Sequence, residues 1–117
     1  MRARLHSIHS SDIDDLDGWT PASADFAVPV RLSVGPDPGS GEESFDVVIC
    51  SVEWLASQVA RDGIVDGRHH FVVEGFDWPK LRHYFQRRAE ACSGDSWHEI
   101  AEQLARIGYW ELESYRP

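Results

Sequence analysis

Phe26-Ala-Val-Pro-Val-Arg-Leu-Ser-Val34 is the stretch that decides the fold. Each of its even-numbered residues is apolar, whereas the odd-numbered positions include Pro29, Arg31 and Ser33. Alternation with a period of two predicts a β-strand that has one buried and one solvent-facing side. Because Pro29 cannot donate a hydrogen bond to a neighbouring strand, we expect this strand to lie at a sheet edge or to contain a bulge.

The residues on either side of this strand predict a hairpin and one further strand. Gly35-Pro-Asp-Pro-Gly-Ser-Gly41 is typical of a loop, because prolines remove backbone donors and glycines permit turn dihedrals. Residues 45–50 alternate again, which predicts an antiparallel partner strand after that loop. A weaker strand pattern covers residues 3–8.

After residue 50 the apolar period becomes that of a helix. Ser51 is the expected N-cap of this helix, and Gly63 is its expected end. Its predicted inward-facing stripe consists of Val52, Leu55, Ala56 and Val59.

The remaining residues predict one strand, two helices and a final strand. Residues 68–74 form the strand, and Asp77 caps a helix that ends before Gly94. Ser96-Trp-His-Glu99 is a capping box that opens the last helix, and residues 109–113 alternate as a strand. We expect the tryptophans at the starts of these elements, Trp78, Trp97 and Trp110, to lie in the core.

These elements predict a single α+β domain over residues 1–117. Their order is βββαβααβ, which favours a largely antiparallel sheet with helices packed on it. The length of 117 residues, of which 42% are hydrophobic, suits one core and argues against two domains.

Charge and hydropathy narrow the class of protein. Eleven Lys and Arg residues against twenty Asp and Glu residues give a net charge of −9, which argues against a nucleic-acid-binding surface and favours a basic partner. No apolar stretch is long enough to span a membrane or to act as a secretion signal, so we expect a soluble, cytoplasmic protein.

We find no pattern typical of catalysis, metal binding or cofactor binding. Cys50 and Cys92 lack the spacing of a zinc site or a disulfide framework, and we expect both thiols to be buried. Neighbouring strand residues such as His69 and His70 face opposite ways, so they do not favour a metal site. The sequence therefore predicts neither a metal nor a cofactor.

Acidic residues are the clearest candidate for a binding surface. Asp12 to Asp17 place four carboxylates in six positions, which indicates a solvated loop. Trp19 follows at once and is either an interface anchor or a loop residue folded back on the core. Lys80, Arg82, Arg87 and Arg88 form the one basic cluster, which we interpret as a solvated helix face or, alternatively, a patch for an acidic partner.

The chain resembles the Immunity protein 8 family over nearly its whole length. The resemblance rests on six segments that occur in the family's order and spacing. They are Ser7-Ile-His-Ser-Ser-Asp-Ile-Asp-Asp-Leu16, Glu42-Glu-Ser-Phe-Asp46, Ser51-Val-Glu-Trp-Leu55, Gly67-Arg-His69, Phe76-Asp-Trp78 and Trp97-His-Glu-Ile-Ala-Glu-Gln-Leu-Ala-Arg-Ile-Gly-Tyr-Trp110.

This resemblance implies a non-enzymatic inhibitor of a cognate toxin in a bacterial polymorphic toxin system. Together with the charge, it leads us to expect stoichiometric occlusion of a basic toxin such as a nuclease. The candidate toxin-binding residues are Asp12, Asp14, Asp15, Asp17, Trp19, Glu42, Glu43 and Asp46. An acidic interaction module unrelated to toxins and a small enzyme using His69, His70 or Cys50 are the alternatives.

Overall fold

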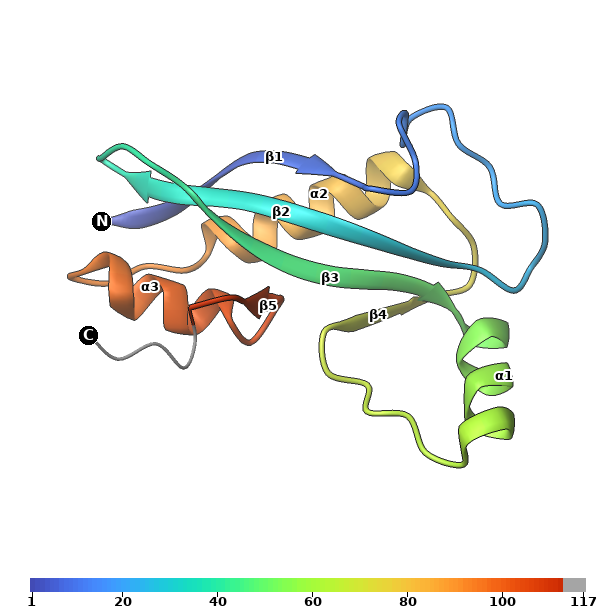
Figure 1. Ribbon diagram of the computed structural model, residues 1–117. Helices are drawn as coiled ribbons and strands as arrows, with labels where there is room; N and C mark the ends of the chain where they lie inside the picture. The colour runs from blue at the N-terminus through green and yellow to red at the C-terminus, as the bar shows by residue number, and fades with distance from the viewer. Residues whose placement is uncertain (113–117) are drawn as a thin grey trace.

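The computed structural model describes residues 1–112 and has the predicted element order βββαβααβ (Figure 1). The strands are β1 (Arg2–His9), β2 (Ala27–Asp37), β3 (Glu43–Ser51), β4 (His70–Val73) and β5 (Tyr109–Trp110). The helices are α1 (Val52–Asp62), α2 (Trp78–Glu90) and α3 (Trp97–Leu104). The predicted α+β fold class is confirmed.

All five strands belong to one sheet. Its order is β1-β2-β3-β4, and β5 pairs with β3 beside the part of that strand that β4 leaves free. Every pairing is antiparallel except that of β3 with β4, which is parallel. Helix α2 lies behind the sheet in Figure 1, so one face is covered and the other is open.

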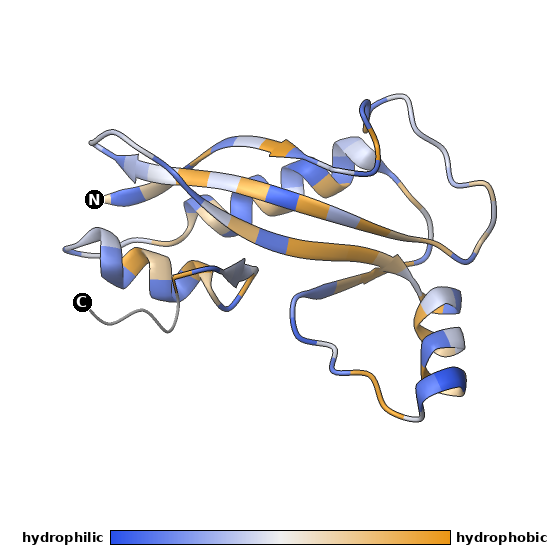
Figure 2. Ribbon diagram, in the orientation of Figure 1, coloured by the Kyte–Doolittle hydropathy of each residue, from blue (hydrophilic) through white to orange (hydrophobic). Residues whose placement is uncertain are grey.

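The core forms between the covered face of the sheet and the helices. The β2–β3 register aligns Val28 with Ile49, Val30 with Val47 and Leu32 with Phe45, and all six side chains are buried. Phe85 of α2 and Ile100 of α3 pack into the same core. Figure 2 shows the resulting hydrophobic bands along β2 and β3.

Strand β2 is longer and more central than the sequence predicts. It continues through Gly35, Pro36 and Asp37, which we expected in a loop, because β1 pairs with these three residues, whereas the pairing with β3 ends at Val34. Pro29 is tolerated here because β1 reaches only Arg31 of β2. On the other side, Pro29 lies opposite Val48 of β3, and the Val48 N–H donates to the His69 carbonyl instead of to β2. Pro29 and Val48 are therefore a non-hydrogen-bonded pair, and the missing N–H of the proline removes no hydrogen bond between β2 and β3.

Two other strands are shorter than predicted. β4 begins at His70 because Arg68 and His69 form a turn in which His69 has a φ of 64°. β5 ends at Trp110, and the expected continuation to residue 113 lies partly outside the described residues. Among the tryptophans, Trp78 and Trp110 are buried as predicted, whereas Trp97 is half-buried and packs at the edge of the core.

Helix α1 is placed as predicted, but its apolar stripe is not buried. Ser51 caps it and Gly63 ends it with a φ of 81°, as the sequence indicates. However, α1 projects from the end of β3 (Figure 1), and Val52 and Val59 are 54% and 43% exposed. The predicted inward face was wrong because α1 contacts the ends of β3 and β4 and projects beyond the sheet instead of lying across it (Figure 1).

We predict that Ser51→Ala lowers the free energy of unfolding by about 2 kcal/mol. The buried Ser51 hydroxyl accepts hydrogen bonds from the backbone N–H groups of both Trp54 and Phe26, at 3.1 Å each. Its loss leaves the buried Phe26 donor without that partner. Urea unfolding measures the change, and Ser40→Ala in the exposed hairpin loop is the control, expected within about 0.5 kcal/mol of the parent. Equal stability of the two variants would contradict this role.

Candidate functional site

The predicted acidic loop joins β1 to β2 and is fixed by its own contacts. The Asp15 carboxylate accepts a hydrogen bond from the Asp17 backbone N–H at 3.1 Å, and the Asp12 N–H donates to Ser10. Leu16, between the acidic residues, is buried in the core. The loop is therefore anchored and presents four exposed carboxylates to solvent, those of Asp12, Asp14, Asp15 and Asp17.

Trp19 is folded back on the body of the protein. Its ring makes edge contacts with Phe76 and Phe26, at centroid distances of 4.8 and 6.1 Å. Of the two sequence interpretations, the structure therefore shows the packed loop residue. The side chain is half-buried, so part of its ring still lies at the surface beside the acidic loop.

The other three candidate carboxylates are engaged inside the chain. Glu42 pairs with His6 at 2.8 Å, and Glu43 accepts a hydrogen bond from the Trp110 indole at 2.5 Å. Asp46 forms a two-pronged ion pair with Arg31, at 2.8 and 3.0 Å, which raises the pKa of that guanidinium. Each of these acids therefore already has a positive or donor group as its neighbour.

The eight candidate residues do not form one patch. Residues 12–19 follow the end of β1, whereas Glu42 and Glu43 lie at the hairpin end of β2 and β3. Strand β2 separates these two ends by about 30 Å. The acidic loop and the hairpin acids are therefore separate surfaces, and Asp46 lies on the open face between them.

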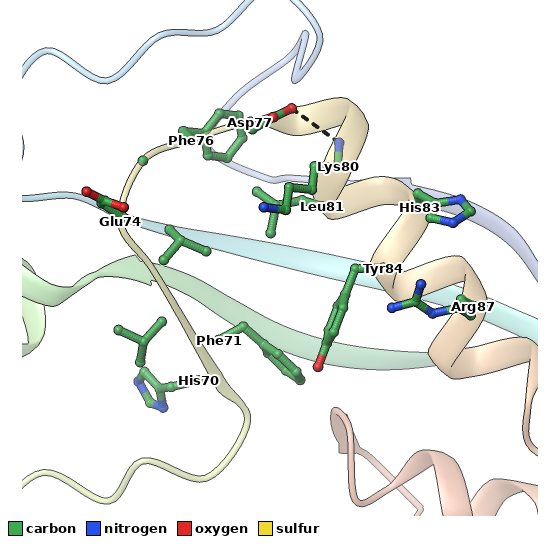
Figure 3. Close-up of a pocket in the computed structure, with 13 residues that line it drawn as sticks. His70, Phe71, Glu74, Phe76, Asp77, Lys80, Leu81, His83, Tyr84 and Arg87 are labelled. Atoms are coloured by element: carbon green, nitrogen blue, oxygen red, sulfur yellow. Dashed lines mark hydrogen bonds between the residues drawn. The ribbon is translucent and has the colours of Figure 1, made fainter.

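A groove between β4 and α2 forms a hollow with a volume of about 1090 Å³. Phe71 from β4 and Tyr84 from α2 extend toward each other across it (Figure 3), with ring centroids 6.0 Å apart. Val72, Val73, Phe76 and Leu81 contribute the other large apolar side chains of its lining. Lys80, His83 and Arg87 line it from the α2 side and are exposed.

The acidic loop adjoins this groove. Phe76 lines the groove and also receives the Trp19 ring that follows the loop. We therefore take the acidic loop, Trp19 and the β4–α2 groove together as the candidate binding surface. It presents carboxylates at one end and the cations of α2 along one wall.

The sequence did not reveal the groove. Lys80 and Arg87 stood out as a basic cluster, but the spacing of residues along α2 cannot show which strand lies beside that helix. The short apolar run Phe71-Val-Val73, bounded by polar residues, was the available signal for a strand at the edge of the sheet.

The family model described as Immunity protein 8 matches residues 3–115 of the 117-residue chain. The chain belongs to the Immunity protein 8 family. No curated protein and no solved structure matches the chain.

In this Immunity protein 8 member, both cysteine thiols are buried, and two histidine rings contact backbone carbonyl oxygens. Cys50 and Cys92 are buried free thiols, as predicted, and burial raises the pKa of both. Nearby Arg88 and Arg106 oppose that rise at Cys92. The Nδ1 atoms of His69 and His70 lie 3.1 and 2.9 Å from the backbone carbonyls of Ile107 and Arg68.

The described residues offer neither a metal-binding cluster nor a membrane-spanning helix. Residues 1–112 contain no group of three His, Cys, Asp or Glu side chains placed to hold a metal ion. Over the same residues, every helix is too short or too polar to cross a membrane.

We predict that Cys50 reacts slowly with a disulfide reagent at pH 8. A raised pKa leaves less of the reactive thiolate at that pH, and the residue has no exposed surface. Cys92→Ser isolates Cys50, and release of the coloured thiolate measures the rate. Reaction should become fast only in denaturant. A native rate equal to that of a small free thiol would contradict the burial and favour a reactive cysteine.

Proposed function

We propose that this immunity protein binds one cognate toxin of a polymorphic toxin system in the cytoplasm and neutralises it by covering its active site. Membership of the family supports the general role of toxin immunity. The proposal adds the stoichiometric mechanism and a basic toxin, such as a nuclease. The observation that carries it is the anchored acidic loop beside an open, partly aromatic groove.

The charge arrangement supports a partner with a positive surface. The chain carries a net charge of −9, and four carboxylates project from one loop. Opposite charges can raise association rates from about 10⁶ to about 10⁸ M⁻¹s⁻¹ or more at low salt. Fast capture suits an inhibitor that must reach its toxin before the toxin reaches its target.

The anchoring of the loop supports tight binding as well as steering. Leu16 is buried and Trp19 packs on Phe76, so the loop backbone is already ordered in the free protein. A preorganised surface loses less conformational entropy on binding than a flexible one. The loop can therefore hold its carboxylates against toxin cations at a low entropic cost.

The surroundings of Cys50, His69 and His70 fit a binding protein better than the alternative of an enzyme that uses these residues. The Cys50 thiol is fully buried with a raised pKa, which is unfavourable for a nucleophile. The Nδ1 atoms of His69 and His70 are within hydrogen-bonding distance of backbone carbonyl oxygens, an arrangement that orients the rings without activating a nucleophile. We therefore propose that the protein inhibits without catalysing a reaction.

We predict that Asp14→Lys plus Asp17→Lys weakens toxin binding at least tenfold at low salt and reduces its salt dependence. Within residues 1–112 these two carboxylates make no hydrogen bond or ion pair, so the change alters charge without removing an internal contact. Titration calorimetry with the toxin encoded beside this chain measures affinity and the expected 1:1 stoichiometry.

Asp37→Lys plus Asp95→Lys is the matched control for charge. Asp37 is exposed at the hairpin end of the sheet, and residues 93–94 contact the start of β1 at that same end. This pair should leave affinity within about threefold of the parent. If only the control pair weakens binding, the interface lies at the hairpin end of the sheet, and the proposed role of the acidic loop is contradicted. Absence of any binding by the parent would favour the module unrelated to toxins.

A further inference from the structure

Strand β4 has an open edge beside the groove. Among the described residues it pairs only with β3, through the register from Val48–His70 to Ser51–Val73. The Val48 N–H donates to the His69 carbonyl, so in a parallel ladder Phe71 and Val73 supply the next bonds to β3. The backbone N–H and C=O of Val72 consequently point away from β3, toward the open edge.

The groove follows this edge. Residues 70–74 all line it, although alternate residues of a strand face opposite sides of the sheet. The hollow therefore extends along the rim of β4 rather than over one face alone. Val72 is 47% exposed there, and the apolar contacts of Phe71 and Tyr84 form the adjoining wall.

The wall contributed by α2 is positive. Lys80, His83 and Arg87 line the groove from this helix, and all three are exposed. Two acids also line the groove: Glu74 is exposed directly after the end of β4, and Asp77 uses its side chain to cap α2 by accepting a hydrogen bond from the Lys80 N–H. A ligand lying between β4 and α2 would therefore meet apolar rings below it and cations along one side.

We propose that the toxin adds an extended segment to the open edge of β4, with an apolar side chain against Phe71 and Tyr84 and carboxylates facing Lys80 and Arg87. This inference rests on the proposed toxin-binding function and specifies part of its contact. In strand addition, main-chain hydrogen bonds supply affinity and side-chain pockets supply specificity. The groove offers both from neighbouring elements.

A second copy of this chain fits the groove less well than such a segment. Pairing of two β4 edges about a two-fold axis would bring both α2 helices to the same junction. The Lys80 and Arg87 side chains of each copy would then face like charges. A partner segment with carboxylates complements the same cations, so we commit to the toxin as the occupant.

Val72→Pro tests the main-chain contact directly. It removes the outward N–H while the side chain lies on the open face, and proline is tolerated at strand edges. We expect the dissociation constant for the neighbouring toxin to rise about tenfold or more, whereas Val72→Ala stays within about threefold of the parent. Circular dichroism and thermal melting verify that both variants fold. A folded Val72→Pro variant that binds like Val72→Ala overturns the inference.

Hydrogen exchange supplies a measurement that needs no variant. In the parent complex the Val72 amide should exchange at least tenfold more slowly than in the free protein, because it donates to the added segment. Unchanged exchange at Val72 in a saturated complex also overturns the inference. This result decides the question even if Val72→Pro does not fold.

Two charge-reversal double variants test whether the added segment is acidic. Lys80→Glu plus Arg87→Glu should weaken toxin binding about tenfold, whereas Arg82→Glu plus Arg106→Glu changes net charge equally outside the groove and should have a small effect. Equal effects of the two pairs would contradict an acidic segment. If the parent binds toxin but these tests fail, only the docking mode is wrong; if the parent does not bind, the proposed function fails with it.

Discussion

The antiparallel pairing of β2 with β3 is the interaction on which the rest of the structure depends. It aligns Val28, Val30 and Leu32 with Ile49, Val47 and Phe45, so two alternating sequences combine into one continuous apolar face. A shift of one residue would turn that face to solvent, and the burial of these side chains therefore specifies the register. The helices α2 and α3 cover this face.

The same pairing determines where binding can occur. Because β2 spans the sheet from end to end, the loop after β1 and the hairpin acids are held far apart, and the two acidic segments cannot contact one small site. Because β3 pairs with β2 on one side, β4 can join only on the other, where its second edge is open. Trp19 then places the acidic loop against Phe76 at the end of the β4–α2 groove.

Much of the fold was predictable because it is encoded locally. The alternation in residues 26–34 and the caps at Ser51, Asp77 and Ser96 all act within a few residues of the chain, and each one is confirmed. Predictions that depend on distant neighbours were less successful. The α1 stripe remains exposed and Pro29 lies in an interior strand, since the sequence does not say which elements pack beside them. The groove was missed for the same reason, whereas the acidic loop was visible in composition alone.

The central claim is that this chain protects by covering a toxin, and survival of cells that express both proteins tests it most directly. The toxin encoded beside the chain is expressed from an inducible promoter in a host with no related genes, with or without the immunity protein. We predict growth only when the immunity protein is present, and loss of protection when the two are held in separate cells. Death at equal toxin levels despite abundant folded immunity protein would contradict the account.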